Sequence, residues 1–136
     1  MEKKIILLVE ADILIRHPLA EYLRGCDYLV IEAIDAQEAR LVIDKGERSV
    51  DVALLDISEE TGRNFALAGW MRENRPEIEV LRAGTIGRAV DQAQELCSEQ
   101  PDLQRPYDHK LVADRIRRLL AERERRTEDG KLLRQA

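Results

Sequence analysis

Three acidic residues come at the ends of apolar runs of strand length, which is an unusual place for a carboxylate. Glu10 and Asp12 follow the run at residues 5–9, and Asp56 follows the run at residues 50–55. An ionised carboxylate is costly to bury without a partner, so packing alone rarely explains an acid in this place. Hard divalent cations take oxygen ligands. The three acids therefore indicate a divalent cation, or a phosphate chemistry that needs one.

A structural explanation stays open for two of these acids. Glu10 and Asp12 can equally belong to a solvated loop or cap the N-terminus of a helix. This explanation is weaker for Asp56, because Asp56 ends a run that reads as a buried strand.

The elements that must position these acids follow from the alternation of two patterns along the chain. Apolar runs of strand length lie at residues 5–9, 28–33, 50–55 and 78–81, and a weaker run ends near residue 104. Stretches of helical periodicity separate them, and this alternation is typical of βα units around a parallel sheet. Ligands of such sheets collect beyond the carboxyl ends of the strands. We therefore expect the three acids at one edge of the sheet.

Five helices are expected, at about residues 15–26, 36–43, 65–71, 86–97 and 109–120. Pro18 should delay or bend the first helix, and Asp35 with Glu38 forms a capping box before the second. The pattern over 86–97 is the clearest of all. The last helix continues into a charged segment, so we interpret residues 1–126 as a single domain and residues 127–136 as a flexible tail.

Composition excludes several classes of protein. The chain has 136 residues, 44% of them hydrophobic, a net charge of -5 and only 4% aromatic residues. It lacks the basic surface and the stacking rings of nucleic-acid binders. No segment approaches the ~18 apolar residues of a membrane span, so a cytoplasmic protein without a membrane partner is expected. Cys26 and Cys97 have no metal-binding spacing and read as buried thiols.

Three segments together carry a family resemblance. IILLVEADILIRHPLAEYL, VDVALLDI and QRPYDHKLVADRIRRLL, in this order and with these separations, resemble the receiver domain of two-component response regulators over about residues 3–121. The resemblance implies an α/β, flavodoxin-like fold, a doubly wound five-stranded parallel sheet in the order 2-1-3-4-5 with five helices. It also implies a phosphoprotein of two-component phosphorelay signalling rather than an enzyme.

The resemblance assigns roles to several residues. Asp56 matches the aspartate that accepts the phosphoryl group, and Arg105 stands in place of the lysine that contacts phosphate. Glu10 matches the first of two adjacent metal-binding acids, but Ala11 stands where the second is expected. The implied metal site is therefore a weak Mg2+ site.

Its ligands would be the carboxylates of Glu10, Asp12 and Asp56, with the backbone of Ser58. Glu59 and Glu60, in the loop after Asp56, either replace the missing ligand or belong to a solvated loop, and the second interpretation is favoured.

The switch positions of the family also differ here. The switch hydroxyl falls on Ala83 or Gly84, and only Thr85 offers a displaced substitute. The aromatic residue usual in the fifth strand falls on Asp102.

We interpret the chain as a stand-alone receiver that acts through protein contacts. The resemblance implies a histidine kinase or phosphotransfer protein as donor and a downstream partner at the fourth and fifth helices, a face that can also form a homodimer. One alternative is a pseudo-receiver adaptor that works without phosphorylation. A more distant one is a small Mg2+-dependent phosphotransferase or phosphatase.

Overall fold

The computed structural model describes residues 2–46, 49–84 and 102–135. These residues form a parallel sheet of five strands, with the bounds β1 Ile5–Val9, β2 Leu29–Ala33, β3 Val52–Asp56, β4 Glu79–Gly84 and β5 Leu103–Gln104. The strand order is β2-β1-β3-β4-β5, as expected for the flavodoxin-like fold. The helices within the described residues are α1 Ile13–Gly25, α2 Ala36–Lys45, α3 Arg63–Asn74 and α5 His109–Gln135. The helix expected over 86–97 lies outside the described residues.

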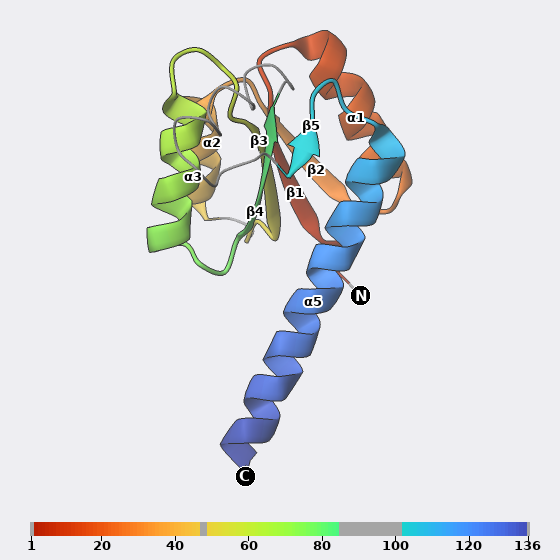
Figure 1. Ribbon diagram of the computed structural model, residues 1–136, viewed down its shortest axis with the longest axis vertical. Helices are drawn as coiled ribbons and strands as arrows, with labels where there is room; N and C mark the ends of the chain where they lie inside the picture. The colour runs from red at the N-terminus through yellow and green to blue at the C-terminus, as the bar shows by residue number, and fades with distance from the viewer. Residues whose placement is uncertain (1, 47–48, 85–101, 136) are drawn as a thin grey trace.

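Helices cover both faces of the sheet (Figure 1): α1 and α5 lie on one face, and α2 and α3 lie on the other. Each face has its own apolar cluster, because successive side chains of a strand point to opposite faces. Ile6 and Leu8 of β1 face the cluster that includes Ile116 of α5. Leu7 and Val9 face the cluster that includes Met71 of α3. Both clusters are buried, so the sheet holds the strand ends in fixed positions.

The first helix starts earlier than its proline suggested. It begins at Ile13 and contains Pro18. Asp12 is its N-cap, and the side chain of Asp12 accepts a hydrogen bond from the backbone N–H of Leu14. The cap satisfies a backbone donor that the first turn would otherwise leave unpaired. Cys26, expected to be buried, follows this helix and is only half-buried.

The last helix is longer than the sequence indicated. Residues 127–135 of the segment expected to be a flexible tail form the last turns of α5, which runs past the end of the sheet in Figure 1. The flexibility of this segment stays a prediction. Among the described helices, none combines the length and the apolarity that a membrane crossing requires.

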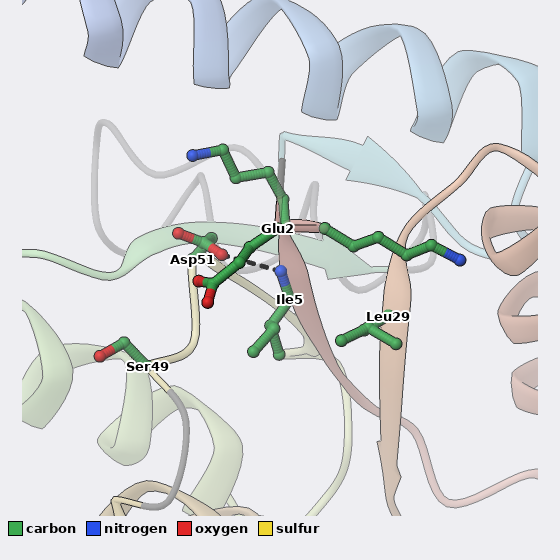
Figure 2. A pocket seen from close by; sticks show the side chains of 7 residues that line it. Glu2, Ile5, Leu29, Ser49 and Asp51 are labelled. Carbon is green, nitrogen blue, oxygen red and sulfur yellow. Dashed lines mark hydrogen bonds between the residues drawn. The ribbon is translucent and has the colours of Figure 1, made fainter.

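Ionic contacts hold α5 against the domain at Arg123 and Arg126. Nη2 of Arg123 donates to Oδ1 of Asp51 at 2.9 Å. The other oxygen of Asp51 accepts the backbone N–H of Ile5 at 2.8 Å. Figure 2 shows Asp51 and Ile5 in a pocket at the amino ends of the strands, which is also lined by Glu2 and Leu29. Arg126 makes a further ion pair with Glu79. Asp51 therefore joins β1 and α5 at the amino edge of the sheet.

The first prediction concerns this contact. Arg123→Ala should lower the free energy of unfolding by about 1–2 kcal/mol, because Asp51 loses a charged hydrogen-bond partner. Urea denaturation measures the change. Arg125→Ala is the matched control, since Arg125 is exposed on the same helix, and it should change stability by less than about 0.5 kcal/mol. Equal effects of the two substitutions would contradict the role given to Arg123.

Candidate functional site

Two buried carboxylates lie side by side at the carboxyl edge of the sheet. Glu10 directly follows β1 and Asp56 is the last residue of β3, and these two strands are paired in parallel. Glu10 is 1% exposed and Asp56 is 5% exposed. Burial of two like charges so close together is unfavourable without a cation. The structure therefore brings together two of the acids that the sequence singled out, and it requires a positive partner for them.

Arg105 is that positive partner. Its guanidinium donates to both oxygens of Glu10, from Nε to Oε1 at 2.5 Å and from Nη2 to Oε2 at 3.1 Å. Nε also lies 3.4 Å from Oδ2 of Asp56. The hydrogen bond with Glu10, followed by the charge of Asp56, raises the pKa of Arg105 above its ordinary value against the opposing effect of burial. The guanidinium therefore stays charged beside the two acids.

The two oxygens of Asp56 have different surroundings. Oδ1 accepts two hydrogen bonds from Ser58, from the backbone N–H at 2.9 Å and from the hydroxyl at 2.5 Å. Oδ2 lies beside Arg105 and accepts no hydrogen bond from the described residues within the usual length. Asn64 donates to the carbonyl oxygen of Asp56 at 2.9 Å and fixes the backbone there. The carboxylate is thus oriented through Oδ1, and Oδ2 keeps free acceptor capacity.

The predicted Mg2+ ligands are only partly brought together. Glu10, Asp56 and Ser58 lie close, but Asp12 is exposed and its Oδ1 caps α1. The backbone N–H of Asp12 donates to Glu10 at 3.0 Å. In the described part of the chain, no group of three or more His, Cys, Asp or Glu residues is placed to hold a metal ion. Since Arg105 also engages both oxygens of Glu10, this arrangement does not fit Mg2+. Metal binding stays a prediction.

Glu59 organises the loop after Asp56. Its Oε2 accepts from the backbone N–H of Thr61 at 3.0 Å and from the Thr61 hydroxyl, and its Oε1 accepts from the backbone N–H of Asn64 at 3.0 Å. It therefore satisfies an unpaired donor in the first turn of α3, whose N-cap residue, Gly62, has no side chain to do so. Glu60 is exposed. The favoured interpretation of this pair was a solvated loop, and the structure adds a capping role for Glu59.

The residues at the switch positions predicted from the family resemblance lie at the end of β4 and just before β5. Ala83 and Gly84 end β4, and Thr85 lies outside the described residues. Asp102, at the position of the expected aromatic residue, accepts the backbone N–H of Arg82 at 2.9 Å. It ties the start of the β5 segment to β4 and offers no ring.

Sequence reasoning missed a buried arginine that supports the site. Arg16 of α1 donates from Nη1 to the carbonyl oxygen of Glu10 at 2.9 Å and from Nε to Glu32 at 3.1 Å. Glu32 is on β2, and hydrogen bonds from Arg16, His17 and Arg24 outweigh the effect of burial and hold its pKa below the ordinary value. A signal was present in the sequence, because Arg16 has helical spacing with the inward-facing Leu19 and Leu23.

A further residue without an assigned role is Tyr107, two residues after Arg105. Its hydroxyl oxygen is buried and has no hydrogen-bond partner in the described part of the protein.

Comparisons with known proteins agree on the fold. No family model matches the chain, and a search of curated proteins finds no match. Solved structures of receivers are similar to it.

A signal receiver domain of an HD domain-containing protein from Pseudomonas fluorescens is 18% identical with a TM-score of 0.72, covering 90% of this chain and 98% of that one. A response regulator receiver domain protein from Clostridium thermocellum is 16% identical with a TM-score of 0.74, covering 89% and 97%. A CheY-like one from Methanospirillum hungatei is 20% identical with a TM-score of 0.74, covering 92% and 99%. The chain therefore has the fold of receiver domains.

The second prediction tests the pairing of Arg105. Arg105→Met removes the charge and keeps apolar volume, so Glu10 becomes a buried carboxylate without its cation. The free energy of unfolding at neutral pH should fall by about 3–5 kcal/mol. The double substitution Glu10→Gln with Arg105→Met should recover part of this loss, because the buried group is then neutral. Denaturant unfolding of wild type and of both variants measures these changes, and a loss under about 1 kcal/mol in Arg105→Met would contradict the pairing.

The third prediction concerns the pH dependence of Glu59. Burial acts to raise its pKa, but hydrogen bonds from Thr61 and from the backbone of Asn64 outweigh burial and hold the pKa below its ordinary value. Its stabilisation is therefore present above the unfolded pKa, about 4.3, and is lost as the pH falls through the lower folded pKa. Glu59→Gln should cost about 1 kcal/mol at neutral pH, as for other caps, and nothing in acid.

Thermal unfolding of wild type and variant between neutral and acidic pH makes this comparison. Glu60→Gln is the matched control, because Glu60 is exposed in the same loop. A difference between wild type and Glu59→Gln that does not change with pH would rule out a contribution from the charge.

Proposed function

We propose that this chain is a cytoplasmic receiver-type signalling protein that acts through protein contacts rather than as an enzyme, with Asp56 as its phosphoacceptor. The observation that carries the proposal is the state of the Asp56 carboxylate. Ser58 holds Oδ1 with two hydrogen bonds, while Oδ2 keeps acceptor capacity and lies 3.4 Å from the guanidinium of Arg105. An oriented anionic oxygen next to a cation is suited to attack a phosphoryl group.

The proposed reaction needs a phosphoryl donor, a nucleophilic oxygen and a cation. The phosphohistidine of a kinase or phosphotransfer protein is the donor that the receiver fold favours. The bond from phosphorus to Oδ2 of Asp56 forms while the phosphorus–nitrogen bond breaks, and the imidazole leaves after taking up a proton. Nη1 of Arg105 makes no hydrogen bond to the described residues, so it is available to a phosphoryl oxygen. The guanidinium of Arg105 would thereby stabilise the negative charge on the phosphoryl oxygens during the transfer.

The downstream partner would bind a surface that includes α5. This helix runs from the carboxyl ends of the strands, next to the loop of Arg105, to their amino ends, where Arg123 and Arg126 form ion pairs. A change at the loop that precedes α5 can therefore reach the exposed surface of the helix.

A second candidate function is an adaptor that needs no phosphorylation. The pairing of Arg105 with Glu10 favours it, because both oxygens of this acid accept from the guanidinium. An occupied Glu10 weakens any metal site, and a receiver without metal would be expected to accept phosphate slowly.

The fourth prediction separates the two candidates. Wild-type protein incubated with radiolabelled acetyl phosphate should acquire label that Asp56→Asn abolishes. Added Mg2+ should change the rate little in wild type. Ala11→Asp, which restores a second acid, should make labelling depend on Mg2+ and increase its rate by about tenfold.

Circular dichroism and urea unfolding establish that both variants fold. Label in Ala11→Asp but none in wild type would reject phosphorylation of the natural chain and select the adaptor. Strong stimulation of wild type by Mg2+ would show that Arg105 yields Glu10 to the metal.

A further inference from the structure

Tyr107 lies two residues after Arg105, in the loop that leads from the candidate site into α5. It lies on the loop between Arg105 and the start of α5, and its ring packs against the apolar cluster that contains Val112 and Ile116. Its hydroxyl oxygen is buried and finds no partner among the described residues. Buried polar atoms nearly always form a hydrogen bond, so an exception points to a missing partner.

The charges of the candidate site act on the pKa of this hydroxyl. Burial gives the largest increase in the pKa of Tyr107, and the charges of Glu10 and Asp56 raise it further, while Arg105 opposes them. The phenol therefore stays protonated and has one hydrogen to donate. Its missing partner must be an acceptor.

The acceptors in the described part of the site are unequally occupied. Both oxygens of Glu10 accept from Arg105, and Oδ1 of Asp56 accepts twice from Ser58. Oδ2 of Asp56 is left without a hydrogen bond from the described residues. The described residues around the candidate site thus include a hydroxyl donor without an acceptor and a carboxylate oxygen without a donor. A group attached to Oδ2 that carries acceptor oxygens can engage the hydroxyl.

We propose that Tyr107 is the switch residue of this protein: its hydroxyl donates to a phosphoryl oxygen carried by Asp56 and takes the place of the hydroxyl absent at Ala83 and Gly84. The inference rests on the proposed function. Tyr107 takes no part in the phosphoryl transfer itself and is therefore a positioning residue. Its contact with the phosphorylated Asp56 changes the position of the start of α5.

The start of α5 is the element that responds. Asp108 follows Tyr107 and caps this helix, accepting the backbone N–H of Leu111 on its side chain at 3.2 Å and that of Val112 on its carbonyl at 3.0 Å. A ligand that engages only one position of Tyr107 shifts the population toward that position. Movement of Tyr107 therefore moves the first turn of α5.

The experiment compares wild type, Tyr107→Phe and the control Tyr28→Phe. Tyr28 is a half-buried tyrosine that packs against the same cluster. Each protein is titrated with beryllofluoride and Mg2+ as a probe of the phosphoryl group, and the amide signals of residues 108–113 are followed by NMR. Each is also labelled with radioactive acetyl phosphate, and its unfolding without ligand is measured in urea.

Tyr107→Phe should bind beryllofluoride about tenfold more weakly than wild type, as expected for a lost hydrogen bond to a charged group. Its amide shifts at the start of α5 should be lost. Without ligand it should be at least as stable as wild type, because it lacks the unpaired hydroxyl. Tyr28→Phe should keep the affinity and the amide shifts of wild type.

Three results would overturn the inference. Equal affinity and equal amide shifts in wild type and Tyr107→Phe, with wild type labelled, would reject Tyr107 and leave the proposed function standing. A clear loss of stability in unliganded Tyr107→Phe would show that the hydroxyl already has a partner. A wild type that neither takes label nor binds beryllofluoride would reject the proposed function, and the switch role of Tyr107 with it.

Discussion

The guanidinium of Arg105 is the positive charge that lets Glu10 and Asp56 lie buried next to each other. These carboxylates end neighbouring strands of a parallel sheet, so the fold itself forces them together. Their repulsion is strong in a region of low polarity, and a charge brought from 95 residues away along the chain offsets it. The loop after β5 is thereby bound to the end of β1. The carboxyl edge of the sheet depends on this contact.

The same contact occupies an acid that the predicted metal site would need. A cation site needs carboxylate oxygens that are free to coordinate, and the guanidinium occupies both oxygens of Glu10. Asp12, whose carboxylate could contribute, is committed to the first turn of α1. Arginine remains charged under all ordinary conditions, unlike a bound ion that exchanges with solvent. Arg105 therefore supplies a permanent positive charge to the two buried acids.

Arginines also hold the rest of the molecule around this site. Arg16 joins α1 to the backbone of Glu10 and to Glu32 on β2, so the support for the acid extends to the edge strand. At the amino ends of the strands, Arg123 binds Asp51. This ion pair holds α5 against the domain at a point past the apolar contacts of the helix. Helix α5 thus begins next to the loop that contains Arg105 and Tyr107, and the ion pair of Arg123 with Asp51 attaches it to the domain near β3. A displacement of that loop would therefore move the start of α5 while the ion pair at Arg123 holds the later part of the helix in place.

The fold class, the strand order implied by the family resemblance, and the presence of Glu10, Asp56 and Arg105 at one site could all be predicted from the sequence. Local patterns carry that information, because burial fixes the period of apolar residues and parallel strands place their ends at one edge. Only the tertiary structure decided that Arg105 pairs with Glu10, that Asp12 caps a helix, and that residues 127–135 continue α5. The unpaired hydroxyl of Tyr107 is likewise invisible in the sequence. Such outcomes depend on which partner a long polar side chain reaches in space, and no spacing along the chain specifies that.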